Sequence, residues 1–254
     1  MKIKKMGKIN LIMPMGGLGS RFLKKGISVP KPLIELNGKP FFYWATNSIF
    51  NYVEVEQLVF VIQQRHCEEY NLDKVILSYY PNASIVKISN VLNGALLTGL
   101  KGLEVVDNFY PVVFNDCDHL FICKKFYQYC NDRKKMSAFD GALLTFKSNN
   151  PGYSYIAKDK LNNVSYTVEK KVVSDDAICG AYYFRDKYII LENYKNYISN
   201  CNYNEYYFSG LYNELIRNNA IVKNFDVDIH ISFGTPEELE IAKKNNIFKR
   251  WSIT

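Results

Sequence analysis

Glycines and cations gather in one short stretch near the N-terminus, PMGGLGSRFLKKGISVPKP at residues 14–32. Three glycines stand within four positions. Arg21 and Lys31 follow, the lysine between two prolines. Glycines allow a backbone to approach a ligand closely, and the prolines hold the lysine in extended backbone. Because backbone amides and cationic side chains together bind phosphate groups, the stretch predicts a loop that wraps around a phosphate chain.

Two well-known phosphate-binding motifs fit this stretch poorly. The fingerprint G-x-G-x-x-G needs a third glycine where the sequence has Phe22. A P-loop needs G-K-[ST], and the sequence has Gly19-Ser20-Arg21 instead. The remaining interpretation is a loop whose glycine amides face a phosphate chain while Arg21 and Lys31 supply positive charge.

Alternating strands and helices are expected to position this loop. Apolar and amphipathic runs predict strands at 9–14, 58–62, 84–88 and 111–115, with helices at 40–51, 66–79 and 93–103 between them. Strands separated by helices of this length form right-handed β-α-β units. The expected fold class is therefore α/β, a three-layer α/β/α Rossmann-like arrangement around a mostly parallel mixed sheet.

The pattern of alternating strands and helices ends at about residue 140. Closely spaced strand-like pieces there predict an added β-hairpin region: GALLTF, YSYIAK, NNVSYTVEK and CGAYYF. Helices at 187–199 and 205–218, a strand at 221–227 and a closing helix from Pro236 are expected to follow. The sequence has no proline-rich or serine-rich linker and no internal repeat. We expect a single domain over 1–254, with halves at 1–140 and 141–254.

Composition restricts the class of partner. The 254 residues are 48% hydrophobic and 22% charged, which is typical of a globular chain with a good core. With 32 basic against 25 acidic residues the net charge is +7, which suits an anionic ligand, and no basic-aromatic repeat indicates nucleic acid. No apolar run is long enough to span a bilayer, and six cysteines form no C-x-x-C pair. We expect a cytoplasmic protein with reduced thiols and no membrane partner.

Several segments, in order and at sensible distances, resemble the signature of the sugar-1-phosphate nucleotidylyltransferase family. The glycine stretch and its PKPLIELNGKP continuation resemble L-A-G-G-x-G-[ST]-R with P-K-P and G-K-P. NDCDHLF at 115–121 resembles G-D-x-x-F. VEK at 168–170, CGAYYF at 179–184 and GTPEEL at 234–239 resemble E-K-P, G-x-Y-x-F and G-T-P-E-D-L. The resemblance covers residues 9 to 242.

The resemblance implies a role for each matching residue. Arg21 is expected on the β- and γ-phosphates of a nucleoside triphosphate, Lys31 near the α-phosphate, and Asp118 on Mg²⁺, with or without Asp116. Half 1–140 would bind the nucleotide. The implied nucleotide-binding residues are Met15, Gly16, Gly17, Gly19, Ser20, Arg21, Ser89, Asn93 and Gly94.

The implied acceptor site lies in the half 141–254. Lys170, beside Glu169, is expected to hold the phosphate of a small phosphorylated acceptor. Two anions must then be brought together, so catalysis consists mainly of charge neutralisation and in-line positioning, aided by a divalent metal.

The implied reaction is nucleotidylyl transfer with release of pyrophosphate. Its expected products are precursors of capsule or other surface polysaccharide. The first candidate nucleotide is CTP, as in phosphocholine and phosphoglutamine cytidylyltransferases. The alternative is a sugar-1-phosphate uridylyl- or guanylyltransferase, or one that uses dTTP.

Three positions depart from the family pattern. Ser232 stands where many relatives have a second metal-binding aspartate. Either Asp226 or Asp228 substitutes for it, or one protein carboxylate holds the metal together with phosphates. A base-contacting glutamine is absent near Gly94, which leaves Ser89, Asn90 and Asn93. The proline of E-K-P is replaced by Lys171.

Two rival functions follow from the same residues. Asp116-Cys117-Asp118 is also a D-x-D, the diphosphate-metal motif of glycosyltransferases of related architecture, but those enzymes do not need the glycine loop. Ser232 would also suit a catalytically silent regulatory homologue that keeps the fold. Pyrophosphate release separates these functions from nucleotidylyl transfer. The sequence does not indicate an oligomeric state.

Overall fold

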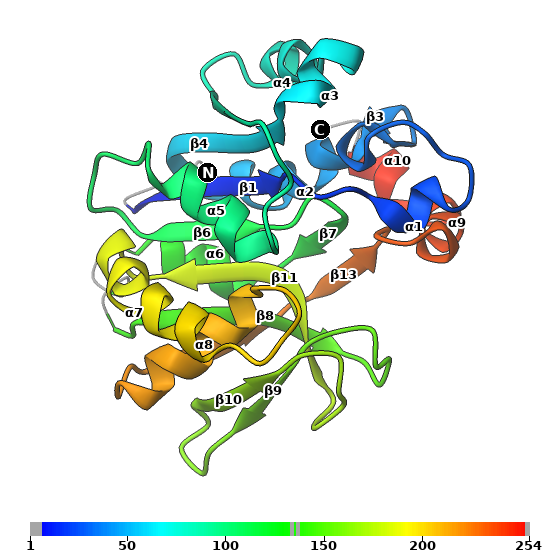
Figure 1. Cartoon of the computed structure of the whole chain (residues 1–254). Helices are drawn as coiled ribbons and strands as arrows, with labels where there is room; N and C mark the ends of the chain where they lie inside the picture. Colours follow the sequence, from blue (N-terminus) through cyan, green and yellow to red (C-terminus); the bar gives the residue numbers. More distant parts are fainter. Residues whose placement is uncertain (1–6, 133–134, 136–137, 252–254) are drawn as a thin grey trace.

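A nine-stranded mixed sheet forms the centre of the molecule (Figure 1). The structure, a computed structural model, describes residues 7–132, 135 and 138–251. The strand order is β10-β9-β11-β6-β1-β4-β5, and β8 pairs with both β11 and β12. The strands of this sheet are β1 (Lys8–Met15), β4 (Glu54–Gln63), β5 (Ser84–Ile88), β6 (Val112–Asn115), β8 (Gly141–Lys147), β9 (Tyr155–Lys158), β10 (Val164–Val168), β11 (Asp176–Phe184) and β12 (Val222–Asp226).

The strands from the first half are parallel to one another. β1 lies between β4 and β6, so that Leu11 is opposite both Leu58 and Val113. β5 extends the parallel set beyond β4, whereas β11 joins β6 in the antiparallel sense. The predicted α/β fold class, with a parallel core and an added antiparallel region, is confirmed.

Helices cover both faces of the sheet. Leu11 and Met13 of β1 point into one core and Ile12 into the other, as alternation along a strand requires. Helices α2 and α6 pack on the first face, and α5, α7 and α8 on the second. The helices are α1 (Ser20–Leu23), the 3-10 helix η1 (Lys31–Leu33), α2 (Phe41–Phe50), α3 (Gln64–Tyr70), α4 (Leu72–Tyr79), α5 (Ala95–Leu103), α6 (Lys124–Cys130), α7 (Lys187–Asn200), α8 (Phe208–Arg217), α9 (Pro236–Lys243) and α10 (Ile247–Trp251).

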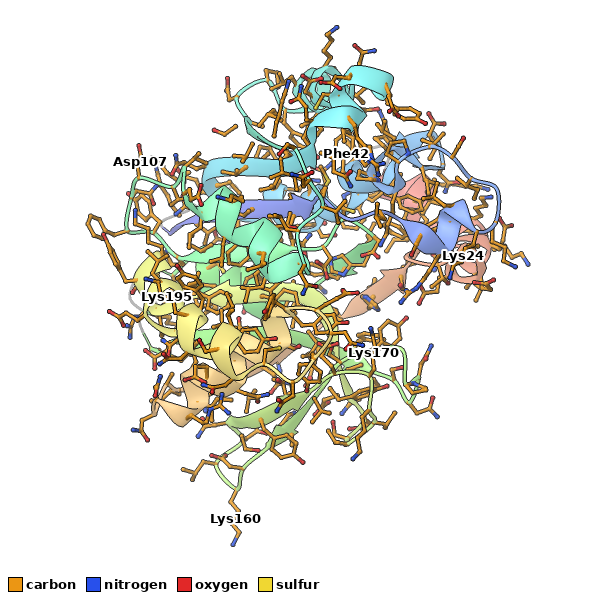
Figure 2. All side chains as sticks on the ribbon, viewed as in Figure 1. Lys24, Phe42, Asp107, Lys160, Lys170 and Lys195 are labelled. Carbon is orange, nitrogen blue, oxygen red and sulfur yellow. The ribbon has the colours of Figure 1, made fainter. Side chains whose placement is uncertain are left out.

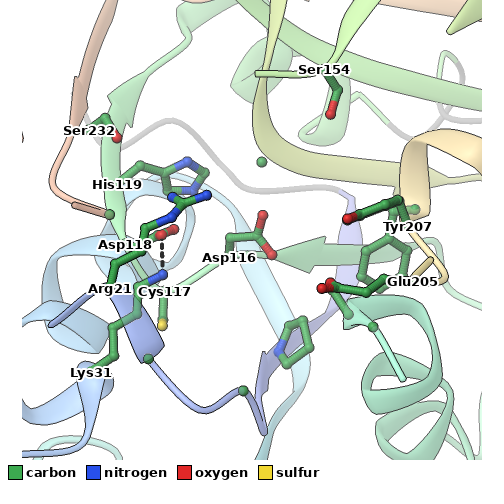
Figure 3. A pocket seen from close by; sticks show the side chains of 18 of the residues that line it. Arg21, Lys31, Asp116, Cys117, Asp118, His119, Ser154, Glu205, Tyr207 and Ser232 are labelled. Atoms are coloured by element: carbon green, nitrogen blue, oxygen red, sulfur yellow. Dashed lines mark hydrogen bonds and ion pairs between the residues drawn. The ribbon is translucent and has the colours of Figure 1, made fainter. Parts of the chain in front are cut away.

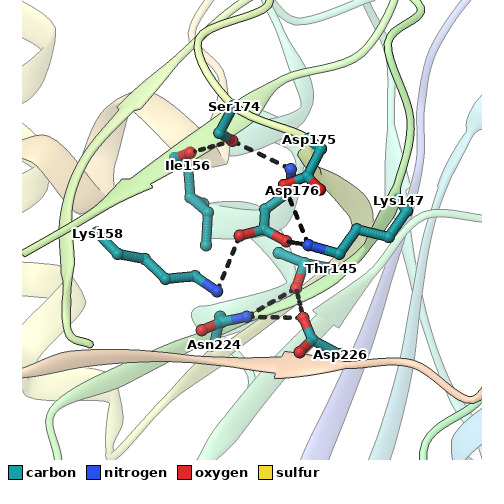
Figure 4. A network of polar contacts seen from close by, with 9 residues as sticks. All are labelled: Thr145, Lys147, Ile156, Lys158, Ser174, Asp175, Asp176, Asn224 and Asp226. Atoms are coloured by element: carbon teal, nitrogen blue, oxygen red, sulfur yellow. Dashed lines mark hydrogen bonds and ion pairs between the residues drawn. The ribbon is translucent and has the colours of Figure 1, made fainter.

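The second half adds the expected hairpin. β9 and β10 pair antiparallel, and Lys160 projects from their connection (Figure 2). A buried carboxylate, Asp176, ties this region to β8 because it pairs with Lys147 at 2.7 Å and Lys158 at 2.8 Å (Figure 4). Burial alone raises the pKa of Asp176, but the two lysines lower it below its usual value. This network stabilises the hairpin and lies apart from the cavity described below.

Several elements differ from the sequence-based expectation. The helix expected at 66–79 is two helices, because Asn71 takes a left-handed conformation between them. The helix expected at 205–218 begins only at Phe208. Two small sheets were not predicted, β2 (Glu35–Leu36) with β3 (Lys39–Pro40) and β7 (His119–Ile122) with β13 (Ile229–Ser232). Over the described residues, every helix is too short or too polar to cross a membrane.

Candidate active site

A cavity of about 890 Å³ opens where β1 and β6 end. The carboxyl ends of parallel strands are the usual place for ligands in open α/β sheets. One wall comes from the glycine stretch and from 116–119, and the opposite wall comes from 150–154, 169–170 and 205–208. Segments far apart in the sequence therefore meet at one site (Figure 3).

Most of the predicted nucleotide-binding residues line this cavity. The exceptions are Gly16 and Ser89, which are not among the lining residues. Gly16 is packed beneath the loop, since a Cβ atom there would lie 2.6 Å from Cδ1 of Ile88. The lining members are Met15, Gly17, Gly19, Ser20, Arg21, Asn93 and Gly94.

Arg21 and Lys31 lie on the same side of the cavity as Asp118 (Figure 3). Lys31 Nζ forms an ion pair with Asp118 Oδ2, across 87 positions of sequence. Burial by itself lowers the pKa of the Lys31 ammonium, but the interactions with Asp118, Cys117 and Asp116 together outweigh burial and raise that pKa. Within the described residues, the Arg21 side chain has no hydrogen-bond or ion-pair partner. Its guanidinium is therefore available to an anionic ligand.

The two aspartates differ in their surroundings. Burial alone raises the pKa of Asp118, yet Lys31 lowers it below its usual value, so this carboxylate stays charged. Burial and the neighbouring Asp118 charge raise the pKa of Asp116 well above the usual range. Gly180 packs against Asp116, because a Cβ atom there would lie 2.8 Å from Asp116 Oδ2.

A magnesium ion fits this donor set. Mg²⁺ prefers oxygen ligands and keeps several waters, so one or two carboxylates with substrate phosphates suffice. Asp118 and Asp116 offer such oxygens at the cavity wall, next to the predicted phosphate-binding loop. Within the described residues, no cluster of three or more His, Cys, Asp or Glu side chains could hold a metal alone. Water or oxygen atoms of the substrate would therefore complete the coordination of any metal here.

The suggested substitutes for the missing aspartate are wrong. Asp226 accepts hydrogen bonds from Thr145 at 2.9 Å and Asn224 at 3.0 Å, and Asp228 accepts one from the Lys124 amide. Neither lines the cavity. Asp226 is the last residue of β12, and Asp228 lies two residues beyond it. β12 pairs with β8, which is separated from β1 by β11 and β6.

Ser232 does occupy the cavity wall, opposite His119 in the β13–β7 pair. The His119 ring is fixed by a 2.9 Å hydrogen bond between its Nε2 and Asn115 Oδ1. Burial lowers the pKa of His119 to about 4, so the ring is neutral at pH 7. A neutral imidazole and a hydroxyl thus stand beside Asp118.

The opposite end of the cavity holds the predicted acceptor residues. Glu169 Oε1 accepts hydrogen bonds from the hydroxyls of Ser154, at 2.5 Å, and Ser209. Lys170 Nζ donates to Tyr207 Oη at 2.9 Å, and this hydrogen bond raises the pKa of the lysine. A mixed polar, aromatic and cationic lining of this kind suits a small phosphorylated molecule.

Sequence reasoning missed the partners of these two residues. Ser154, Tyr207 and Ser209 carry no motif, and they approach Glu169 and Lys170 only through the fold. The two serines gave no signal, whereas tyrosines between residues 153 and 207 were expected near the acceptor, and Tyr207 does line the cavity.

Comparison with solved structures shows which fold this is. The nucleoside-diphosphate-sugar pyrophosphorylase from Vibrio cholerae RC9 is similar with a TM-score of 0.80 and 23% identity, over 92% of this chain and 100% of that one. The inositol-1-phosphate CTP transferase from T. maritima is similar with a TM-score of 0.73 and 16% identity, over 94% and 96%. The chain has the nucleotidyltransferase fold. A UDP-glucose pyrophosphorylase complexed with UDP-glucose is also similar, with a TM-score of 0.72 and 18% identity over 96% and 99% of the chains.

The nucleotidyltransferase fold is thus shared over nearly the whole chain, and the resemblance seen in the sequence is confirmed at the level of the fold. No protein-family model matches the chain, and no curated protein sequence is similar enough to match it.

Proposed function

We propose that this protein is a nucleotidylyltransferase that transfers a nucleoside monophosphate from a nucleoside triphosphate to a small phosphorylated acceptor and releases pyrophosphate. One observation carries the proposal. The glycine stretch, Arg21, Lys31 and Asp118 meet on one wall of a single cavity, and Lys170 lines the same cavity. A site with a pair of cations next to carboxylates and a third cation apart from them suits the joining of two phosphates.

The roles proposed for the residues follow from their charges. Arg21 binds the distal phosphates of the triphosphate, and Lys31 exchanges part of its contact with Asp118 for the α-phosphate. Asp118 and Asp116 would hold a magnesium ion, which would supply charge neutralisation between the two phosphates. Lys170 orients the acceptor phosphate for in-line attack on the α-phosphorus. The bond formed joins the acceptor oxygen to that phosphorus, and pyrophosphate leaves with the broken bond's electrons.

The same proposal assigns one substrate to each half of the chain. Half 1–140 binds the nucleotide, with Asn93 and Gly94 near the base and ribose, and half 141–254 binds the acceptor. CTP is the first nucleotide to test, and one neighbour in fold is named a CTP transferase. The neighbours named for nucleotide sugars make a sugar phosphate with UTP, GTP or dTTP the next choice. Supply of precursors for capsule or other surface polysaccharide is the proposed cellular role.

The test is a screen with pyrophosphate as the readout. Purified protein is mixed with Mg²⁺, one of CTP, UTP, GTP, ATP or dTTP, and one of a panel of phosphorylated sugars, alcohols and amino acids. We expect release of pyrophosphate for one nucleotide and one acceptor, with no release when the acceptor is omitted. Omission of the metal is expected to reduce the rate strongly, because the charges of the two phosphates and of Asp118 would then be uncompensated.

The rival functions predict different results in the same screen. A glycosyltransferase would consume a nucleotide sugar and release a nucleoside diphosphate, and a silent homologue would bind without turnover. If purified protein binds a triphosphate but releases no pyrophosphate with any member of the panel, the result favours the catalytically silent homologue.

A further inference from the structure

Gln63, the last residue of β4, supports the glycine loop from below. Its side chain is buried, with 3% exposed. Nε2 donates to two consecutive carbonyls, Gly16 O at 2.8 Å and Gly17 O at 3.0 Å. Oε1 accepts a hydrogen bond from Nε of Arg65 at 2.6 Å. That donor settles which end of the amide faces the loop.

These two hydrogen bonds fix the direction of two peptide groups. In a trans peptide the C=O and the following N–H point to opposite sides of the chain. The carbonyls of Gly16 and Gly17 face Gln63, so the N–H groups of Gly17 and Leu18 face the other way. Gly17 and Leu18 both line the cavity. Within the described chain, neither N–H donates to a protein acceptor.

Packing fixes the position of the glycine loop, and hydrogen bonding fixes the orientation of its peptide groups. Gly16 sits against Ile88 and Thr98, where a Cβ atom would come within 2.6 Å and 3.0 Å of their side chains, so contact fixes the position of the loop. Contact alone does not set the rotation of the peptide planes, because glycine has wide conformational freedom. Gln63 supplies that restraint.

We propose that Gln63 is a positioning residue for triphosphate binding: it holds two consecutive peptide groups so that their N–H groups are presented to the phosphate chain. This inference rests on the proposed function. Two unpaired amides aimed in one direction bind an anion well, and their orientation before binding avoids an entropic cost. Gln63 touches neither substrate and acts through the loop alone.

The test compares two neighbouring glutamines. Gln63→Met keeps the length of the side chain and removes its hydrogen bonds. Gln64→Met is the matched control, since among the described residues the Gln64 amide bonds only the Glu68 side chain, at 2.7 Å, and Gln64 does not line the cavity. Calorimetry with Mg²⁺ measures the binding of CTP and of inorganic tripolyphosphate, a phosphate chain without a base. Pyrophosphate release gives KM for both substrates.

We expect Gln63→Met to weaken tripolyphosphate and CTP binding by about tenfold, the effect of losing one to two hydrogen bonds. KM for the phosphorylated acceptor stays unchanged, and Gln64→Met behaves as wild type. A merely structural defect would lower the active fraction and leave both KM values alone. If Gln63→Met does not fold, Arg65→Met, at an exposed position, releases the Gln63 amide and is expected to weaken binding by about threefold.

Two kinds of failure are distinguishable. Wild-type tripolyphosphate affinity in Gln63→Met, or in Arg65→Met where that variant is needed, overturns the positioning role and leaves the proposed function standing. An equal loss of tripolyphosphate affinity in Gln64→Met also overturns the positioning role and leaves the proposed function standing. If wild-type protein binds neither tripolyphosphate nor any of the five triphosphates, the proposed function itself fails.

Discussion

Individual side chains in the cavity differ in how freely they can meet a ligand. Arg21 is exposed and, among the described residues, unpartnered, whereas Lys31 is held by Asp118 and is 25% exposed. The pairing keeps the lysine charged and near the carboxylate that would bind magnesium. Two cations in such different states are suited to different phosphates of one ligand.

Replacement of either cation should therefore slow turnover. We expect Arg21→Ala and Lys31→Ala each to lower kcat/KM by about a hundredfold, as the loss of a charge contact to a transition state does. Lys24→Ala is the control, because Lys24 is an exposed cation near Arg21 that does not line the cavity (Figure 2). The measurement is initial pyrophosphate release. Near wild-type rates for Arg21→Ala or Lys31→Ala would refute the roles assigned to them.

At the scale of elements, the long strand β11 shapes the cavity wall that carries Asp116. Its pairing with β8 is irregular between Ile178 and Tyr182, and Gly180 lies in that interval with φ of +92°. Gly180 O accepts a hydrogen bond from the Asp116 amide at 2.9 Å. The irregular strand thus places backbone against Asp116 where a side chain would not fit.

This geometry predicts that Gly180→Ala damages activity more than stability explains. The added Cβ would meet Asp116 Oδ2 at 2.8 Å and His119 Cε1 at 2.9 Å. We expect activity to fall by about a hundredfold, because displacement of a reacting group by 1 Å has effects of that size. Gly38→Ala is the control, since Gly38 also has positive φ, +74°, with nothing within 4 Å of a Cβ.

Gly38→Ala should lose about 1 kcal/mol of unfolding free energy through backbone strain and keep full activity. Urea unfolding and pyrophosphate release are measured for both variants. If activity falls equally in the two, strain and not contact with Asp116 is responsible.

For the whole molecule, acid sensitivity follows from the three histidines. Burial lowers the pKa of all three below 6.5, to about 4 for His119 and about 3 for His230. Between these values and 6.5 the histidines bind more protons in the unfolded chain than in the folded one, and His119 with His230 outweighs the one proton that Asp116 binds in the folded chain. The free energy of unfolding is therefore expected to fall as the pH drops from about 6.5 toward about 3.

His230→Phe tests this dependence. The His230 ring is stacked on Phe146 with centroids 3.9 Å apart, and its buried Nε2 has no hydrogen-bond partner in the described residues. Phenylalanine keeps the stacking and cannot be protonated. Between pH 7 and 5, we expect the variant to lose about 1 kcal/mol less stability than wild type, allowing for partial exposure. Equal losses in urea unfolding at the two pH values would contradict the assignment.

Prediction from sequence succeeded where the signal is local. The parallel strands followed from short apolar runs, and the strand expected at 84–88 has those bounds in the structure. The start of α9 followed from Thr235 and Pro236, and the structure shows a capping box there. Asn71 and the pairing of β7 with β13 were missed, since a left-handed residue and a contact across more than 100 positions leave no periodic pattern.

The candidate site shows the same division. Arg21 and Lys31 were predicted because loops that hold phosphates use recurrent residue types at short spacing. Asp116, Asp118 and Lys170 were predicted from the resemblance to a known family, and all five residues line the cavity. Gln63 was missed, although it directly follows a predicted strand at the carboxyl edge of the sheet, where ligands gather. The exclusion of Asp226 and Asp228 required coordinates, because only the fold shows that Thr145, Asn224 and Lys124 donate hydrogen bonds to them outside the cavity.

The sequence by itself determined the types of group that this protein brings to its ligands: bare amides, two cations and a pair of carboxylates, each set by residues only a few positions apart. The tertiary structure decided which of them share one cavity, in which protonation state, and which way the loop peptides turn. The physical reason is the distance along the sequence over which each interaction acts. Glycine, proline and periodic apolar residues act on their own neighbourhood of backbone, whereas burial, ion pairing and hydrogen bonds such as those of Gln63 depend on segments that only folding brings together.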